Sequence, residues 1–548
     1  MSERPTLGLD LGTTNLSLAV ARDEAEPPAS ALLTQVVHEG EVAERPLLPS
    51  FLYLPGESEL PEGALALPWD PARPYAVGAF AREQGARIPA RLVSSAKSWL
   101  SYDGVDRRAA ILPWGAPEEV KKVSPVEASA HYLRHVREAW NHLHPDLPLE
   151  TLDLVLTVPA SFDAVARDLT VEAARAAGID QNLTLLEEPQ AALYAWVASN
   201  PDWRKRLQVG DLILVCDIGG GTTDFSLIAV LEEDGALELR RVAVGDHILL
   251  GGDNMDLALA YAVRARLEEG GRKLDDWQLR ALVHSVRQAK ERLLGDDSLP
   301  SAPVVIPGRG SRLVGGSIRT ELDRTILEAT LIDGFFPRVS IGDRPTAPRR
   351  VALTTLGLPY AHDPAFTRHL AAFLRRQIEA PSALPPGVHR EGRSFLHPTA
   401  ILFNGGVTKA QPVRERILEV LQGWVAAEGG EPVKVLEGGD PDLAVARGAA
   451  YYGLVRRGRG ARIRGGSARS YYVGIERAEL AVPGVPPTVD AICVAPFGME
   501  EGTEITLPDE LGLWVGEPAS FRFFPSSSRR DDEVGDAVDP AALEELPP

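Results

Sequence analysis

Two stretches of the sequence repeat one pattern: Asp10-Leu-Gly-Thr-Thr-Asn-Leu-Ser-Leu18 and Asp217-Ile-Gly-Gly-Gly-Thr-Thr-Asp-Phe-Ser-Leu227. Each stretch follows a strand-like apolar run and leads into another, which predicts a tight β-hairpin with its carboxylate at the end of the first strand. Glycine lets backbone amides approach an anion, threonine adds hydroxyl donors, and aspartate can hold a hydrated divalent cation. Two such hairpins predict a duplicated fold that grips one polyphosphate from both sides.

The duplication of the pattern, more than the pattern itself, favours a phosphate site. Aspartate, glycine and threonine are ordinary turn residues, and most single Asp-x-Gly-Thr-Thr turns bind nothing. A matched pair at two strand ends is far less expected by chance, so we favour polyphosphate binding. Neither stretch has the G-x-x-x-x-G-K-[ST] pattern, so the site is not a P-loop.

Length and charge narrow the class of protein. A chain of 548 residues is too long for one compact core and predicts roughly two to four domains. The net charge is −20, from 77 acidic and 57 basic side chains. Nucleic acids and anionic membranes require clustered positive charge, so neither is an expected partner. We interpret the acidity as a contribution to solubility.

The two cysteines, Cys216 and Cys493, lie far apart in the sequence without paired or metal-like spacing. A disulfide framework or a zinc site is therefore not expected, and a reducing cytoplasm is the natural compartment. The N-terminus lacks the apolar core of a signal peptide, and no run approaches the ~18 apolar residues of a membrane span. These features predict a soluble cytoplasmic protein.

Strand-like and helical patterns alternate through most of the chain, which is typical of an α/β fold. Thr151 to Val158 predicts a buried strand, and the helix after it has Asp163 as its N-cap and Gly178 just past its end. Asp275 to Leu294 predicts a long helix. Ile401 to Phe403 predicts another strand, followed by a glycine turn and a helix.

The composition changes in the last part of the chain. Residues 455–469 contain six arginines and four glycines without an acid, which predicts an exposed linker. Short apolar runs separated by glycine and proline follow to residue 524 and predict β structure. The acidic tail from Ser526 is expected to fray. The proline-rich stretch from Pro381 to Pro398 predicts an exposed loop, and Thr330 to His369 has no clear periodicity.

Several blocks together resemble the nucleotide-binding domain of the seventy-kilodalton heat-shock chaperone (DnaK-like) family, within the actin and sugar-kinase superfamily. The blocks are 7–14, 157–162, 187–192, 215–224 and 401–406, with further matches at 250–256 and 440–445. The resemblance covers residues 5–455 and implies a duplicated actin-like (ribonuclease H-like) two-lobed ATPase domain of α/β class, followed by a short all-β module. The implied parts are lobe I at 1–205, lobe II at 206–455 with its last helix returning toward lobe I, a linker at 456–470, a β-rich module at 471–525 and an acidic tail at 526–548.

The resemblance also implies a set of site residues, with ATP or ADP and Mg²⁺ as ligands and K⁺ as a further candidate ion. The implied catalytic residues are Asp10, Lys97, Glu188, Asp217 and Thr222. The implied nucleotide-binding residues are Gly12, Thr13, Thr14, Asn15, Gly220, Gly221, Asp224, Arg287, Lys290, Gly405, Gly406 and Lys409. Asp10 and Asp217 would orient the metal, mostly through its waters, and Lys97 would steady the transferring phosphoryl group. On the residues alone, Lys97 and Lys290 are ordinary lysines on helices, which are more often solvated than functional.

The chain departs from the family around the base. Asn15 stands where the family usually has an aromatic residue, Arg287 and Glu291 replace a Glu and an Arg around Lys290, and Lys409 replaces an arginine that stacks on the base. A guanidinium stacks better than an ammonium, so Arg287 is a candidate to stack from the other side. Base affinity and selectivity are therefore open. The segment 330–398 is also longer than the family pattern, and no role is assigned to it.

The family normally adds an acidic-apolar linker, a peptide-binding β-sandwich and a helical lid, of which this sequence shows a reduced β part and no lid. The leading prediction is a DnaK-like chaperone ATPase, monomeric, whose partners are ATP, unfolded or extended polypeptide and co-chaperones. Peptide binding could also have been lost. The alternatives are an actin-like filament or scaffold ATPase, a small-molecule kinase of the same superfamily, and a nucleotide-binding regulator with little hydrolysis.

Overall fold

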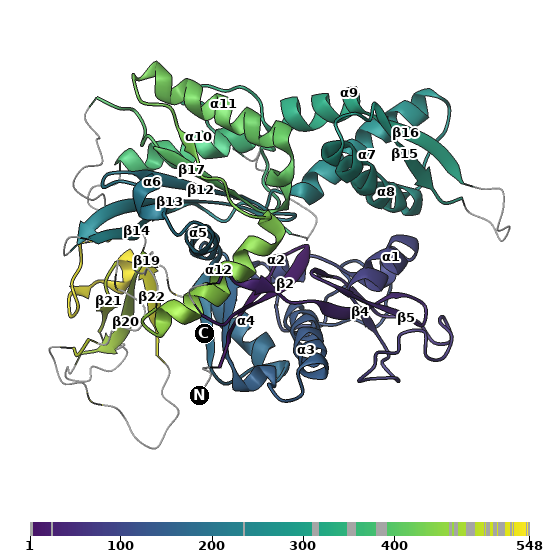
Figure 1. The fold of residues 1–548 in the computed structure, drawn as a ribbon, viewed down its shortest axis with the longest axis horizontal. Helices are drawn as coiled ribbons and strands as arrows, with labels where there is room; N and C mark the ends of the chain where they lie inside the picture. Colours follow the sequence, from purple (N-terminus) through teal and green to yellow (C-terminus); the bar gives the residue numbers. More distant parts are fainter. Residues whose placement is uncertain are drawn as a thin grey trace.

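The structure is a computed structural model that contains two six-stranded sheets of related topology (Figure 1). It describes residues 4–23, 26–233, 236–308, 317–347, 358–379, 392–459, 463–464, 469–477, 488–497, 499, 505–507, 512, 521–526, 529, 531–543 and 545. Among these residues, no helix combines the length and apolar character needed to cross a membrane.

The first sheet is built around the first Asp-Gly-Thr-Thr hairpin. Its strands are β1 (Thr6–Leu11), β2 (Asn15–Ala21), β3 (Ala29–Ser30), β6 (Leu48–Pro49), β10 (Asp153–Val158) and β11 (Leu183–Glu187). Their order is β11-β10-β1-β2-β3, with β6 on β2; β1 is antiparallel to β2 and parallel to β10. Helices α3 (Pro125–Leu143) and α4 (Ala164–Ala176) share one core with β1 and β2.

The second sheet repeats this arrangement around the second hairpin. Its strands are β12 (Leu212–Ile218), β13 (Thr223–Glu233), β14 (Ala236–Val244), β17 (Ala400–Asn404), β18 (Lys434–Val435) and β19 (Ile463–Arg464). Their order is β18-β17-β12-β13-β14-β19, with β12 antiparallel to β13 and parallel to β17. Both hairpins and the predicted duplication of the fold are therefore confirmed.

Two helices, α5 (Glu188–Ser199) and α12 (Pro441–Arg456), lie between the sheets (Figure 1). Their buried side chains share a cluster with Val155 of the first sheet and Ile213 of the second. The backbones approach closely because glycine faces them: a Cβ on Gly448 would lie 1.7 Å from the carbonyl oxygen of Ala191. A Cβ on Gly8 of β1 would likewise lie 2.1 Å from the carbonyl oxygen of Ala446.

Local capping signals define several helix starts. Asp163 caps α4, as predicted, by accepting a hydrogen bond from the N–H of Ala166, and Gly178 follows the helix with a φ of 81°. Asp275 and Gln278 form a capping box at the start of α8 (Asp276–Gly295), which confirms the predicted long helix. These ends depend on neighbours within three residues, so the sequence alone can locate them.

The remaining elements surround the two sheets. Beside the first sheet are β4 (Leu33–His38), β5 (Glu41–Arg45), β7 (Leu52–Tyr53), β8 (Ala76–Val77), α1 (Ala79–Arg87), β9 (Leu92–Val93) and α2 (Ala96–Leu100). The others are α6 (Trp203–Arg206), α7 (Gly252–Glu269), β15 (Ser301–Ile306), β16 (Ile318–Asp323), α9 (Arg324–Leu327), α10 (Phe366–Glu379) and α11 (Gln411–Ala427). Single turns of 3-10 helix lie at Pro89–Arg91, Leu149–Thr151, Gly406–Lys409 and Pro540–Ala542.

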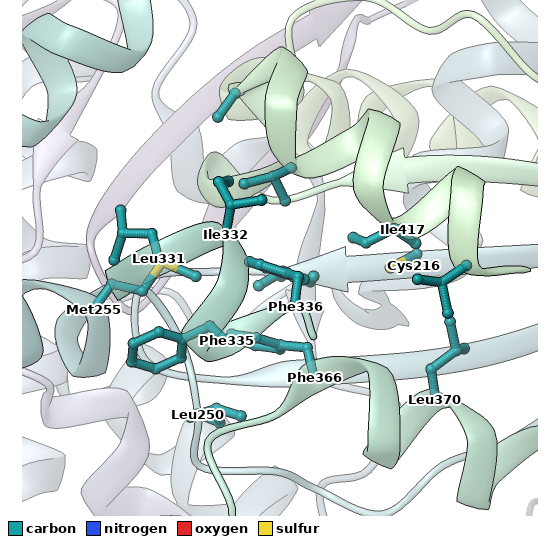
Figure 2. Close-up of a cluster of buried hydrophobic side chains, with 14 of the residues drawn as sticks. Cys216, Leu250, Met255, Leu331, Ile332, Phe335, Phe336, Phe366, Leu370 and Ile417 are labelled. Carbon is teal, nitrogen blue, oxygen red and sulfur yellow. The ribbon is translucent and has the colours of Figure 1, made fainter. Parts of the chain in front are cut away.

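The segment that showed no clear periodicity contributes to the core of the second sheet. A π-helical turn at Glu328–Asp333 leads into Phe336, whose ring stacks on Phe366 of α10 with centroids 4.7 Å apart (Figure 2). The prediction of an exposed loop from Pro381 to Pro398 is wrong at its end, because Phe395 and Leu396 are buried. The first part of that loop, 381–391, lies outside the described residues.

Two predictions about the end of the chain also need correction. Within the predicted exposed linker 456–470, β19 pairs with β14, and Ile463 is buried there. The β prediction is confirmed by a four-stranded sheet with the order β22-β20-β21-β23. Its strands are β20 (Ser470–Glu476), β21 (Val489–Ala495), β22 (Phe523–Ser526) and β23 (Ala537–Val538). Because β23 belongs to the predicted frayed tail and Val538 is buried, part of that tail is folded.

Candidate functional site

The turns of the two hairpins touch one another. A Cβ on Gly220 would lie 1.8 Å from Thr14 Oγ1, and a Cβ on Gly221 would lie 2.7 Å from Thr13 Cγ2. A side chain at either position would force the threonines of the first turn to shift, so glycine lets the two turns come this close. A Cβ on Gly12 would lie 2.3 Å from the carbonyl oxygen of Asn15, so the first turn needs glycine as well. The structure therefore brings both predicted phosphate turns to one place.

A buried lysine lies beside the aspartates of both hairpins. Lys97 of α2 forms an ion pair with Glu188, the first residue of α5. Burial by itself would lower the pKa of Lys97, but the charges of Glu188, Asp10 and Asp217 outweigh burial and raise it. Lys97 therefore carries its positive charge among three carboxylates from three different elements.

Each hairpin aspartate is oriented by the neighbouring parallel strand. Thr157 Oγ1 on β10 donates to Asp10 Oδ1 at 2.9 Å. Asn404 Nδ2 on β17 donates to Asp217 Oδ2 at 2.8 Å. The two donors occupy equivalent positions, because Asp10 pairs with Thr157 and Asp217 with Asn404 in the sheet register. Neither role was predicted from the sequence, although both donors lie in blocks that resemble the family.

The carboxylates raise one another's pKa. Burial, followed by the charges of neighbouring carboxylates, raises the pKa of Glu188 to about 8 and that of Asp217 to about 7, against the pull of Lys97. Burial also raises the pKa of Asp10. Asp224 pairs across the hairpin with Asp217 and adds to the negative charge. Four acidic groups facing one lysine resist full ionisation, and a divalent cation would supply the positive charge that stabilises their ionised forms.

The two hairpin aspartates can be compared with the way proteins bind a hydrated divalent cation. In the described part of the chain, no group of three or more His, Cys, Asp and Glu side chains is placed to hold a metal ion. Mg²⁺ keeps much of its hydration shell and is often bound by one or two carboxylates. Asp10 and Asp217 at the two strand ends fit that mode, and Thr222 belongs to the turn that joins Asp217 to Asp224 in the sequence.

The helix residues predicted to bind the nucleoside are held by α7. Arg287 donates to Asp253 and Asp256, and Lys290 Nζ lies 2.7 Å from Asp256 Oδ1. Lys290 also donates to the carbonyl oxygen of Gly252 at 3.4 Å, beside the second phosphate turn. Both cations are therefore anchored near the turns, with two carboxylates that the sequence analysis did not assign.

The turn after β17 lies on the other side of the second hairpin. Gly405 has a φ of 80°, and a Cβ there would lie 2.4 Å from the carbonyl oxygen of Ile218. Next to Gly406, Lys409 forms ion pairs with Asp442 and Asp440 at 2.6 and 3.3 Å. A cavity of about 310 Å³ adjoins Lys409 at the ends of β17 and β18.

A segment of the long insertion reaches both halves of the molecule. The N–H of Ala361 donates to the carbonyl oxygen of Leu249 at 3.0 Å, whereas Leu358 packs against the core of the first sheet. Burial, followed by the charge of Asp253, raises the pKa of Tyr360 to about 12, so this phenol lies near the α7 carboxylates. Asp363 anchors the segment by accepting hydrogen bonds from the N–H groups of Thr346 and Ala365.

Fold and site together define a two-lobed actin-like ATPase fold, in which two β-hairpins of one pattern meet at an acidic site. Residues 6–338 match the family model described as Hsp70 protein, and the chain belongs to the Hsp70 family. It is 30% identical over 349 residues to the chaperone protein HscA homolog of Ralstonia nicotianae, covering 60% of this chain and 48% of the relative. It is 29% identical over 377 residues to the HscA homolog of Cupriavidus pinatubonensis, covering 65% and 50%.

A third relative gives a similar picture. Chaperone protein HscA of Serratia proteamaculans is 34% identical over 309 residues, covering 54% of this chain and 43% of the relative. The chain thus spans about half the length of the curated relatives it matches. Family membership implies nucleotide binding.

Proposed function

We propose that this chain is a DnaK-like chaperone ATPase that hydrolyses ATP with Mg²⁺ and couples the nucleotide to the binding of extended polypeptide. The observation that carries the proposal is the approach of the two Gly-Thr turns over a buried acidic site. Membership of the Hsp70 family and the chaperone names of the relatives support it. A monomeric state, a cytoplasmic location and the boundaries of the two lobes belong to the same proposal.

The turns and Lys97 would bind the triphosphate. Backbone N–H groups around Gly12 and Gly220 would donate to phosphate oxygens, and the hydroxyls of Thr13 and Thr14 would add further donors. The ammonium of Lys97 would neutralise charge on the γ-phosphate, because Glu188 holds it between the two hairpin aspartates. Asp10 and Asp217 would hold Mg²⁺ mostly through water, and the metal would withdraw charge from the phosphate oxygens.

Hydrolysis would need an oriented water molecule. Its oxygen would bond to the γ-phosphorus while the bond from that phosphorus to the β–γ bridging oxygen breaks, which releases ADP and inorganic phosphate. Glu188, Thr222 and Asp224 are the residues proposed to hold this water in line. The surplus of carboxylates around Lys97 provides the acceptors that this task requires.

The position of the central helices supports coupling to the C-terminal part. Because α5 and α12 lie between the sheets, a rotation of one sheet against the other would turn about these helices. The chain leaves α12 and adds β19 to the edge of the second sheet before it enters the small sheet. Motion at that edge would reach the small sheet through β19, and the small sheet is our candidate for contact with polypeptide.

The decisive measurement is single-turnover ATP hydrolysis by Lys97→Met. We expect the rate to fall by roughly 10²- to 10³-fold, as for the loss of a group that stabilises transition-state charge. Lys205→Met, on an exposed lysine of α6, is the matched control and should hydrolyse normally. Normal hydrolysis by Lys97→Met would show that the assigned site is wrong.

Steady-state assays separate the remaining functions. Stimulation of ATP turnover by an unfolded polypeptide would support the coupled chaperone, whereas an unchanged rate would support an ATPase without a peptide substrate. Nucleotide-dependent pelleting in a centrifuge would instead favour the filament, and sugar-dependent ADP release would favour the kinase.

A further inference from the structure

Three side chains form a hydrogen-bonded chain that ends on Asp224. Ser161 follows β10 of the first sheet, and its hydroxyl donates to Asp224 Oδ1 on β13 of the second sheet. His247, which follows β14, places Nδ1 2.7 Å from Ser161 Oγ. The side chains of Asp224 and His247 are 6% and 15% exposed, so water screens this chain weakly.

The chemistry of the three groups decides which group donates and which accepts in each of the two hydrogen bonds. An ionised carboxylate only accepts hydrogen bonds, so Ser161 must use its single proton on Asp224. The oxygen of Ser161 then accepts from His247, and the imidazole proton lies on Nδ1. His247 Nε2 is buried without a hydrogen-bond partner in the described part of the chain, and a proton there would be an unsatisfied donor. The order is therefore His247 to Ser161 to Asp224.

The imidazole of His247 is linked to the carboxylate of Asp224 through the hydroxyl of Ser161, which both groups contact. His247 Nδ1 lies 3.6 Å from Asp224 Oδ1, beyond hydrogen-bond distance, while the ring of Phe162 packs edge-on against the imidazole at 5.5 Å. This arrangement is not that of a hydrolytic triad, because the histidine and the aspartate contact the same hydroxyl.

We propose that Ser161 and His247 are positioning residues that hold Asp224 in the orientation needed to align the attacking water. The proposal rests on the proposed ATPase function. Ser161 occupies Oδ1 and restricts rotation of the carboxylate, which leaves Oδ2 as the oxygen for water. Because Ser161 lies in the turn after β10 of the first sheet and Asp224 lies in β13 of the second, this orientation also requires the two halves to be in the arrangement described here.

Paired substitutions test the proposal. Ser161→Ala and His247→Ala each break the chain and should lower single-turnover ATP hydrolysis roughly tenfold, the factor expected for one hydrogen bond to a charged group. Nucleotide affinity should stay within about threefold, because neither side chain is proposed to contact the nucleotide. Ser161→Thr keeps the hydroxyl and His247→Asn keeps a donor near Nδ1, so both should retain most of the rate.

Controls separate positioning from a loss of structure. Ser129→Ala removes another buried hydroxyl, which bonds to the carbonyl oxygen of Pro125 inside α3, and should leave hydrolysis unchanged. Equal rates for Ser161→Ala and the unmodified protein, with Asp217→Ala inactive, would overturn this proposal alone. Normal hydrolysis by Asp217→Ala would overturn the proposed function and this inference with it. If Ser161→Ala fails to fold, the comparison of His247→Ala with His247→Asn decides, and equal rates in that pair would refute positioning.

Discussion

Gly448→Ala should destabilise the protein because the added methyl group would push α12 away from α5. The added Cβ would lie 1.7 Å from the carbonyl oxygen of Ala191 and 2.8 Å from the backbone nitrogen of Ala195. Carbon atoms in ordinary contact lie ~3.5–4 Å from their neighbours, so α12 would have to move away from α5 by more than about 1.5 Å. Backbone atoms of a buried helix cannot rotate out of the way.

Two opposing effects set the change in the free energy of unfolding caused by Gly448→Ala. Overpacking a well-packed core costs about 1–3 kcal/mol, and a clash with backbone belongs at the upper end or above. Alanine is a better helix former than glycine by about 1 kcal/mol, which offsets part of the loss at Gly448. We therefore expect the free energy of unfolding to fall by about 2 kcal/mol or more.

The matched control is Gly423→Ala in α11. A Cβ at Gly423 would meet no atom within 4 Å, so the same substitution should stabilise the protein through helix propensity alone. Thermal unfolding of both variants measures the contrast, and Gly448→Ala should melt roughly 4 °C or more below the unmodified protein. A melting temperature of Gly448→Ala equal to that of Gly423→Ala would refute the close packing of α5 and α12.

Three further changes test other parts of the structure. Burial would raise the pKa of Asp363, but hydrogen bonds from Thr346, Ala365 and Arg368 lower it to about 2. The ionised carboxylate therefore stabilises the folded protein above about pH 4, and this stabilisation is lost as the pH falls toward 2. Asp363→Asn should lower the free energy of unfolding by about 2 kcal/mol at pH 7. In thermal melts from pH 7 to 2, the difference in melting temperature between this variant and the unmodified protein should shrink below pH 4. A difference that stays constant would contradict the link between the pKa of Asp363 and stability. Ile463→Asp should release β19 and speed tryptic cleavage of the 456–470 segment roughly tenfold, because a strand paired in a sheet must open before a protease can bind it; an unchanged cleavage rate would argue against the docked strand. Thr157→Val should weaken binding of Mg²⁺ with ATP roughly tenfold in calorimetry by removing the donor to Asp10, and wild-type affinity would exclude that role.

The sequence located the features that depend on neighbouring residues. The hairpins at Asp10 and Asp217 were predictable because their strands and turns are encoded within about a dozen residues. The start of α4 at Asp163 was predictable for the same reason, since its capping contact spans three residues. Family resemblance then linked Lys97 to the hairpins, a relation that its local sequence does not show.

The tertiary structure decided which distant residues meet. Thr157 and Asn404 orient the hairpin aspartates, and Ser161 meets His247, across separations of many residues that produce no periodicity in the sequence. The burial of Ile463 inside an arginine-rich segment was missed because a two-residue strand is specified by the free edge of β14 rather than by its own composition. Turn and cap chemistry is local and can be recognised from the sequence, whereas a contact between single side chains exists only after the two sheets have packed around α5 and α12.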